Sequence, residues 1–237
     1  MVLYMQNSRR WIGAVSAAAV LTLAGCATPV LPYTYTPASA LTATGDVGVG
    51  QFSYEPNKYL QSLAGDAASA RDTRYPNAGL STSQQHTGGP PGAYRATSSH
   101  ILPNQARNTA VGSVLFERNV ADIIRDASFT ELRAIGVTVS GPTISRELTG
   151  EVQNLMVDEL GMNIDWTLRV MYTVAEKSNG DVVYSSIKEI KRTTPKFLNV
   201  LGALNDLIRL NIEALATDPQ FLAAIQNRTQ PMASSRK

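Results

Sequence analysis

The chain has 237 residues, of which 43% are hydrophobic, and its 21 basic and 19 acidic residues give a formal net charge of +2. This near balance excludes the strongly basic surface that nucleic-acid binding needs. The single cysteine excludes an internal disulfide bond, and the length suits one domain with additional irregular sequence.

The first 25 residues have the three parts of a bacterial signal peptide. Arg9 and Arg10 form a basic start, and an uncharged apolar stretch follows from residue 11 to residue 23. This stretch is too short to span a bilayer comfortably. Removal of residues 1–25, which hold two basic residues and no acid, would leave 19 residues of each charge in a formally neutral mature chain.

The signal peptide ends in the run Leu23-Ala24-Gly25-Cys26, which contains the only cysteine. This run resembles the lipobox of bacterial lipoproteins. The resemblance implies cleavage between Gly25 and Cys26, and acyl chains such as palmitate on Cys26. Two or three acyl chains hold a protein on a membrane where one chain does not. In lipoproteins of the enteric type an aspartate after the cysteine favours the inner membrane, so Ala27 favours the outer membrane.

Three other interpretations of Cys26 stay open. The segment can be an ordinary secretory signal with an incidental cysteine, or an anchor that is not cleaved. A catalytic thiol is a third, although no histidine or carboxylate lies near Cys26 in the sequence to activate it. The run Arg9-Arg10-Trp11 also hints at a twin-arginine signal, but its flanking positions fit poorly.

The mature chain is expected to begin with a lipidated tether over residues 26–44, which are rich in Pro, Thr and Ala. A single domain follows over residues 45–228. Its first element is a strand over residues 46–54, and Gly48 and Gly50 favour a β-bulge where the apolar alternation shifts.

Apolar patterning almost disappears between residue 56 and about residue 110. This composition predicts a long flexible insertion in the domain, which can also hold a partner-binding segment that orders on contact. Both histidines, His86 and His100, lie in the insertion without the spacing of metal ligands. We therefore predict no metal site.

A helix is predicted over residues 114–135, because apolar residues recur there at helical spacing. Asn119 is an internal capping signal, which leaves the start of the helix open between residues 113 and 119. Gly136 suits the helix end, because glycine adopts a left-handed backbone without a Cβ clash.

Four strands are predicted after this helix. The clearest alternation of apolar and polar residues runs from residue 164 to residue 174, and the turn dipeptide Asn179-Gly180 then leads into a returning strand. These patterns predict strands over residues 137–139, 148–160, 164–174 and 182–191.

A second long helix is expected to cover the apolar face of these strands. It would begin with Thr194 as N-cap and Pro195 at the first helical position, and end near residue 215. A short last helix would begin at Asp218-Pro219, and residues 229–237 are expected to form a disordered tail.

This element order predicts an α+β fold, a two-layer sandwich in which two long helices cover one face of a mainly antiparallel sheet. Trp166 and Tyr172 lie on the apolar face and are expected in the core. The common hydrolase, metalloprotease and phosphate-binding motifs are absent. We therefore predict no catalytic residue, no cofactor and no enzymatic activity.

A lipobox, a tether and this order of elements resemble two groups of bacterial envelope lipoproteins. These are the YajG type and the auxiliary lipoproteins of lipid-trafficking ABC systems, the PqiC type. The resemblance is carried by residues 102–116, 127–137 and 148–152. It implies a place in the cell envelope and a role without catalysis.

The functional hypothesis is an accessory or scaffold protein on the periplasmic face of the outer membrane. Its partners would be the membrane, through the acyl chains on Cys26, and other envelope proteins, but not nucleic acid. The alternative is a carrier that holds lipid or another envelope precursor in an apolar groove. A filled core and such a groove need the same pattern of Leu, Ile and Val, so the sequence leaves both open.

Overall fold

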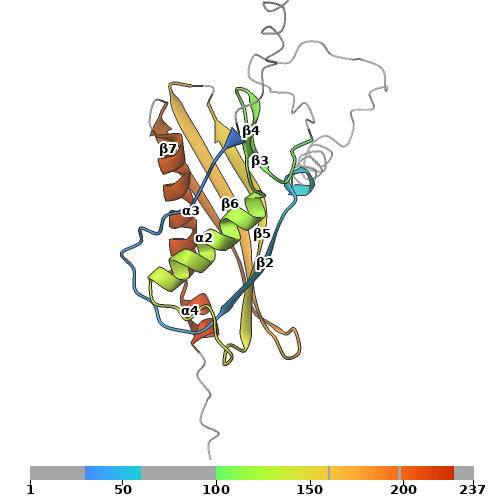
Figure 1. Ribbon diagram of the computed structural model, residues 1–237, viewed down its shortest axis with the longest axis vertical. Helices are drawn as coiled ribbons and strands as arrows, with labels where there is room; N and C mark the ends of the chain where they lie inside the picture. The colour runs from blue at the N-terminus through green and yellow to red at the C-terminus, as the bar shows by residue number, and fades with distance from the viewer. Residues whose placement is uncertain (1–29, 60–99, 160, 197–198, 227–237) are drawn as a thin grey trace, which may run out of the picture. The chain divides into compact units, whose positions relative to one another are not determined.

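The computed structural model describes residues 30–59, 100–159, 161–196 and 199–226. The fold is that of the unit which begins at Leu31 (Figure 1). Its strands are β1 (Val30–Leu31), β2 (Gly48–Tyr54), β3 (Gln105–Asn108), β4 (Gly112–Phe116), β5 (Arg146–Asp158), β6 (Asn163–Glu176) and β7 (Val182–Pro195). The described long helices are α2 (Val120–Ala134) and α3 (Val200–Ala216), and a short helix α4 (Pro219–Ile225) follows them.

The strands form one mixed sheet of seven strands, so the predicted α+β class is confirmed. Along the sheet the order is β1-β4-β3-β5-β6-β7, and β2 also pairs with β5. The pairs β3–β4, β5–β6 and β6–β7 are antiparallel, whereas β2 and β3 run parallel to β5. The parallel pairs arise because β2 and β3 reach β5 from distant parts of the chain, without a tight hairpin.

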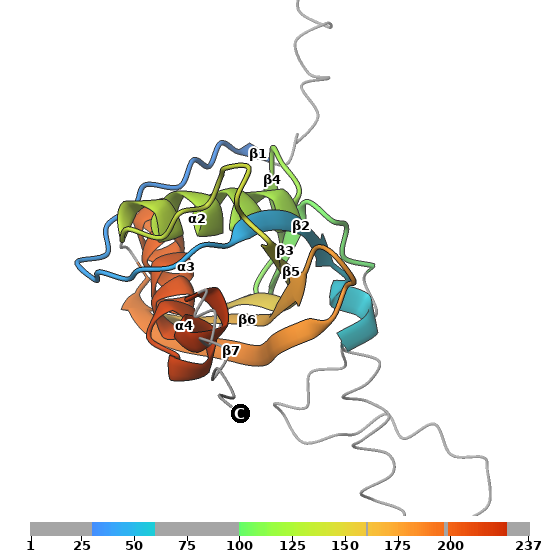
Figure 2. The same cartoon turned by 90° about the horizontal axis from the view of Figure 1, so that it is seen from below.

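The helices pack on the concave side of the curved sheet (Figure 2). Helix α2 contacts β2 and β5, α3 contacts β6 and β7, and α4 contacts β7. The inward side chains of β6 are all buried: Ile164, Trp166, Leu168, Val170, Tyr172 and Val174. This alternation confirms the expected core positions of Trp166 and Tyr172, and it places the centre of the core between β6 and α3.

A buried hydrogen-bond network joins α3 to the sheet. The Tyr172 hydroxyl donates to Asn211 Oδ1 at 2.8 Å, and Asn211 Nδ2 donates to the Lys188 carbonyl at 3.0 Å. Asn211 is fully buried, so these bonds satisfy a polar side chain that would otherwise destabilise the core. The network fixes the position of α3 along β6 and β7.

The start of the first long helix is the main correction to the predicted elements. Residues 112–116 form strand β4, and residues 105–108, expected within the flexible insertion, form its antiparallel partner β3. Helix α2 begins at Val120 with Asn119 as its N-cap, which is the later of the starts that the sequence left open. Val114 and Phe116 alternate with Leu115, and such a short apolar run fits either a strand or a helix, so pairing with β3 decides the outcome.

The second long helix also begins later than predicted. Strand β7 continues to Pro195, and Thr194, expected as an N-cap, instead accepts a hydrogen bond from Trp166 Nε1 at 2.9 Å. The N-cap of α3 is Asn199, whose side chain accepts from the amides of Leu201 and Gly202. Pro195 ends an edge strand, where its missing N–H costs no ladder bond.

Smaller elements were predicted with mixed success. The β-bulge in β2 is confirmed by a register shift between Val49 and Phe52. The end of α2 at Gly136 is confirmed by its φ of 105°. The strand predicted over residues 137–139 is reduced to an isolated bridge between Thr138 and Asp46. Residues 60–99 of the insertion predicted over residues 56–110, and the tail predicted over residues 229–237, lie outside the described residues.

Gly150→Ala is expected to lower the free energy of unfolding by about 1–3 kcal/mol, because it overpacks the core. A Cβ on Gly150 would come within 2.9 Å of three carbons of the Phe52 ring. That ring has little room to move, since it packs edge-on against Tyr172 with a centroid distance of 6.1 Å. Urea unfolding measures the change.

Two further variants test this explanation. Gly161→Ala is the control, because the nearest atom to its Cβ would lie 3.9 Å away, and its effect should stay below about 0.5 kcal/mol. Adding Phe52→Leu to Gly150→Ala should recover part of the lost stability. Purely additive effects of the two substitutions would contradict the proposed clash.

Candidate functional site

The N-terminal segment over residues 31–45, which we call the strap, lies on the two long helices. In Figure 1 it passes from β1 across α3 and α2 before entering β2. Its backbone bonds to α2 where the Ala43 amide donates to the Ile135 carbonyl at 2.8 Å. Tyr33 is buried on the helices with 8% of its surface exposed.

On α2 the strap is held by Glu131, a carboxylate with no exposed surface. The Ser39 amide donates to Glu131 Oε1 at 2.7 Å, and the Tyr35 hydroxyl donates to Glu131 Oε2. Burial, and then the hydrogen bond to Glu131, raise the pKa of Tyr35, so its hydroxyl stays a donor at neutral pH. A buried carboxylate is tolerated only with such donors, so the strap and Glu131 depend on each other.

On α3 the strap is held by Asn205. The Thr36 amide donates to Asn205 Oδ1 at 2.9 Å, and Asn205 Nδ2 returns a bond to the Thr36 carbonyl at 2.9 Å. The Tyr33 hydroxyl also donates to Asn205 Oδ1, at 3.3 Å. Together these contacts correct the expected tether. From Leu31 onward its residues belong to the domain.

This correction shortens the segment between the lipobox and the domain. Cys26 and Leu31 are five residues apart, and an extended chain spans at most about 3.5 Å per residue. The connection between the predicted acylation site and the strap is therefore no longer than about 17 Å. A tether over residues 26–44 would have reached several times as far.

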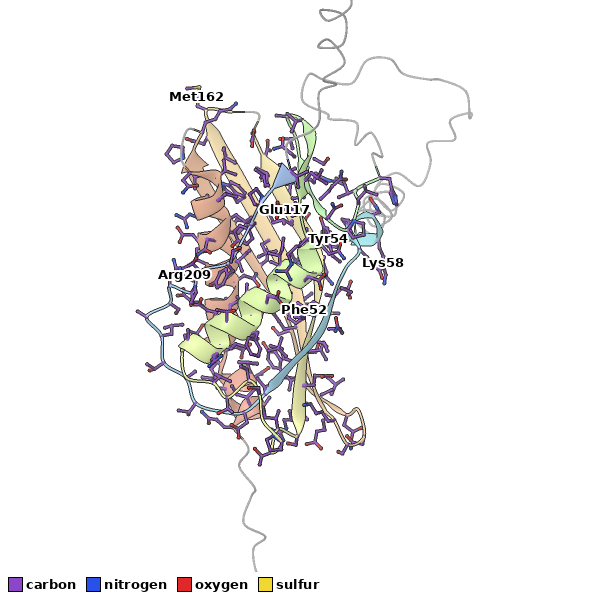
Figure 3. All side chains as sticks on the ribbon, in the orientation of Figure 1. Phe52, Tyr54, Lys58, Glu117, Met162 and Arg209 are labelled. Carbon is purple, nitrogen blue, oxygen red and sulfur yellow. The ribbon has the colours of Figure 1, made fainter. Side chains whose placement is uncertain are left out.

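One end of the sheet, which we call the tip, is formed by residues 109–111, 161–162, 196 and 200. The Thr109 amide donates to the Val157 carbonyl at 3.0 Å, and Lys196 Nζ donates to the Glu159 carbonyl at 3.0 Å. Large apolar side chains are exposed there: Val111 at 73%, Met162 at 82% and Val200 at 38%. Figure 3 shows Met162 at the end of the sheet that lies away from α4.

A small apolar cavity lies just below the tip, between the sheet and the start of α3. It is lined by Leu31, Val114, Val157, Trp166 and Val200, among others, and its volume is about 20 Å³. That volume is on the scale of a single water molecule. This cavity is therefore a packing defect in the core rather than a ligand site.

Two larger hollows are open to solvent. One of about 450 Å³ lies between the strap and the start of α3, lined by Tyr33, Thr36 and Asn205. The other, of about 580 Å³, lies between α4 and the start of β7. At the first hollow, the Tyr33 hydroxyl and the Thr36 amide of the strap both donate to Asn205 of α3.

A cluster of charged and polar groups surrounds Asp218, the N-cap of α4. Asp218 Oδ2 accepts hydrogen bonds from Lys188 Nζ at 2.6 Å and from the Tyr184 hydroxyl at 2.9 Å. The Gln220 amide donates to its other oxygen at 2.8 Å. Burial alone would raise the pKa of Asp218, but these hydrogen bonds outweigh it and hold the pKa at about 2. The cluster joins α4 to β7.

Asp218→Asn is expected to lower the free energy of unfolding at neutral pH by about 1–2 kcal/mol, because Lys188 loses a charged hydrogen-bond partner. Since the pKa of Asp218 falls from its ordinary 3.8 to about 2 on folding, its contribution is complete above pH 3.8. That contribution is lost as the pH falls towards 2. Urea unfolding at several pH values should show the two proteins converging between pH 4 and pH 2. A constant gap across this range would contradict the assignment.

The predicted acylation site is not visible in this geometry. The lipobox residues Leu23, Ala24, Gly25 and Cys26 lie outside the described residues, as does His86.

His100 is described, and its Nδ1 lies 3.3 Å from Asn57 Nδ2. Within the described ranges, no cluster of three His, Cys, Asp or Glu side chains could hold a metal ion. None of the described helices is long and apolar enough to cross a membrane.

The sequence analysis did not identify Glu131 and Asn205 as the residues that bind the strap to α2 and α3. Glu131 had a detectable signal, because it falls seven residues after Ile124, on the same helical face as the buried Ala127 and Ser128. A carboxylate on a buried helix face requires donors from elsewhere in the chain. Asn205 gave no comparable signal.

Comparison with known proteins yields a similarity of fold. A crystal structure of a DUF330 protein from Xanthomonas campestris matches with a TM-score of 0.51 and 11% identity, covering 83% of this chain and 96% of that chain. A hypothetical protein of Chlamydia trachomatis matches at a TM-score of 0.40 and 10% identity, covering 77% and 99% of the two chains. A lipoprotein of Neisseria meningitidis matches at a TM-score of 0.24 and 11% identity, covering 73% and 99%.

No protein-family model matches the chain, and no curated protein matches its sequence. At 11% identity, the similarity to the DUF330 protein concerns the fold alone and transfers no functional residue. The predicted YajG or PqiC type therefore stays a prediction.

Proposed function

We propose that the protein is a lipid-anchored accessory or scaffold protein of the bacterial envelope, held at a membrane surface by acyl chains on Cys26. One observation carries the proposal: the chain joins the sheet at Leu31, in β1, only five residues after Cys26. An acylated Cys26 would then keep the domain within about 17 Å of the membrane. Such confinement raises the effective concentration of membrane-bound partners without any new contact.

A role in binding is favoured over catalysis by how the polar groups are used. Glu131, Asn205 and Asp218 each hold two parts of the fold together through several hydrogen bonds. A general acid or base needs a side chain that is free to reach substrate, and these three are committed to structure. The protein is accordingly proposed to act through protein contacts.

The membrane is proposed to be the outer membrane, with the domain on its periplasmic face. Support comes from the sequence, where Ala27 rather than an aspartate follows Cys26. The resemblance to envelope lipoproteins leads to the same compartment.

The lipid-carrier alternative receives less support. A carrier needs an apolar cavity that takes up at least one acyl chain. The apolar cavity below the tip has a volume of about 20 Å³, and the side chains of β6 and α3 fill the space beside it. A carrier would have to open this core, whereas a scaffold uses the surface as it stands.

Purification of the full-length protein from the membrane fraction in mild detergent tests the proposal. Intact mass should show a chain that begins at Cys26 and carries acyl mass. Chemical cross-linking before lysis should join the protein to a defined envelope protein. A chain without acyl mass would overturn the anchor, and a stoichiometric extractable lipid with no cross-linked partner would favour the carrier.

A further inference from the structure

We propose that the tip enters the interfacial region of the bilayer that carries the acyl chains, with Val111 and Met162 as the inserting side chains. The inference rests on the proposed lipid anchor and adds an orientation to it. The partner that covers these apolar side chains is therefore the lipid bilayer itself. The domain contacts the membrane through the tip, which gives it a defined orientation.

The short connection between Cys26 and Leu31 favours the tip as the end of the domain that contacts the membrane. Leu31, the first residue of the strap, lines the small cavity together with Trp166. Trp166 is three residues from Asn163, where β6 begins at the tip, which corresponds to about 10 Å at 3.3 Å per residue. A connection of up to about 17 Å between Cys26 and Leu31 allows the tip to touch the surface in which Cys26 is anchored.

The same comparison of distances excludes membrane contact by the opposite end of the sheet. Val182 pairs with Ala175, nine residues beyond Trp166 along β6, or about 30 Å away. If that end faced the membrane, Leu31 would lie about 30 Å above the surface, further than the connection from Cys26 reaches. The exposed Val182 therefore cannot insert while Cys26 is anchored.

The tip presents its apolar side chains on ordered turns. Asn108 Oδ1 accepts from the amides of Ala110 at 2.8 Å and Val111 at 3.0 Å, which fixes the turn between β3 and β4. Lys196 Nζ donates to the carbonyls of Glu159 and Gly161, which holds the turn that carries Met162. Turns that are already held in this way lose little backbone entropy on insertion, so even two apolar side chains can orient a domain that acyl chains already hold at the surface.

The charges near the tip are compatible with this contact. Asp158 accepts a hydrogen bond from the Thr109 hydroxyl at 2.7 Å, and Glu159 accepts one from Asn108 Nδ2 at 3.0 Å. Their charges are thereby partly compensated by donors of the domain. The Lys196 ammonium lies in the same place and suits anionic headgroups.

The test uses single cysteines in the full-length, membrane-purified protein. If Cys26 is acylated through its sulfur, the natural chain has no free thiol, so an introduced cysteine is labelled alone. Val111→Cys and Met162→Cys probe the tip, and Val182→Cys is the matched control, an exposed valine at the opposite end. Each carries an environment-sensitive fluorophore and is reconstituted into vesicles of phosphatidylethanolamine and phosphatidylglycerol that contain a spin-labelled quencher lipid.

We expect quenching at positions 111 and 162 to exceed that at position 182 by at least about twofold, since interfacial insertion reaches about 5–10 Å into the bilayer. Equal quenching at all three positions, or quenching at position 182 alone, would overturn the proposal. Protection of positions 111 and 162 by a cross-linked protein, without quenching, would also overturn it in favour of a protein partner. Circular dichroism melts confirm that each variant is folded.

The labelling step distinguishes a failure of the proposed tip insertion from a failure of the proposed lipid anchor. The chain without an introduced cysteine should take up no label. If it does take up label, Cys26 is not acylated and the proposed function fails. If it stays unlabelled and binds vesicles but the tip positions are unquenched, the anchor holds and only the orientation is wrong.

Discussion

Cys26→Ala is expected to remove all acyl mass from the protein and to move it from the membrane fraction to the soluble fraction. Each buried CH₂ of an acyl chain contributes about 0.8 kcal/mol, so losing two or three chains removes essentially all membrane affinity. The tip cannot compensate, because it exposes only a few apolar side chains, among them Val111 and Met162. Intact mass and fractionation of cells that express each protein measure the change.

A variant at the next position is the matched control for Cys26→Ala. Ala27→Asp leaves the predicted acylation site intact, so the protein should keep its acyl mass and its membrane association. By resemblance to enteric lipoproteins, it should move from the outer to the inner membrane, which separation of the two membranes would reveal. Cys26→Ala protein that stays membrane-bound would contradict the lipid anchor, and Ala27→Asp protein that stays in the outer membrane would contradict the sorting argument.

The sheet was predictable where its strands follow one another directly. Strands β6 and β7 alternate cleanly and are joined through Asn179 and Gly180, and Gly180 has the expected positive φ of 78°. In such a hairpin the partner strand is the next one in the sequence, so local pattern and turn chemistry determine the pairing. The β2 and β3 pairings with β5 could not be found this way, because their partners are distant in the chain.

The strap escaped prediction for a different physical reason. Residues 31–45 have no helical or strand period, and their order comes from single side chains, chiefly Tyr35 and Tyr33, that fit onto α2 and α3. A segment rich in Pro, Thr and Ala looks like a linker by composition unless the receiving groups are known. The short reach from Cys26, on which the proposed function depends, was therefore visible only in the structure.

Glu131→Ala is expected to lower the free energy of unfolding by about 2–4 kcal/mol and to release the strap. The substitution removes two hydrogen bonds to a charged acceptor, each worth about 1.5–3 kcal/mol, and it leaves a cavity beside α2. Part of this loss is offset because a buried charge is also removed. Urea unfolding gives the stability change, and hydrogen exchange of the Ser39 amide reports on the strap itself.

Two further variants provide a comparison for the loss of stability in Glu131→Ala. Tyr35→Phe removes one of the two donors and should cost about 1–2 kcal/mol, whereas Arg133→Ala, on the exposed face of the same helix, should cost less than about 0.5 kcal/mol. A Glu131→Ala protein whose Ser39 amide stays as protected as in the unaltered chain would contradict the holding role.

A released strap would change how the domain meets the membrane. If the strap also left Asn205 and β1 left β4, the connection from Cys26 would end at Gly48, where β2 begins, and would span 22 residues in place of five. At about 5–6 Å times the square root of the residue number, its mean reach is about 25 Å, and its full extension is far longer. The tip would no longer be confined to the surface, so fluorophores at positions 111 and 162 should lose much of their quenching although the acyl chains remain. In Glu131→Ala the stability and the order of the strap around Ser39 are thus expected to fall together. In Cys26→Ala the fold should persist and only membrane attachment should be lost.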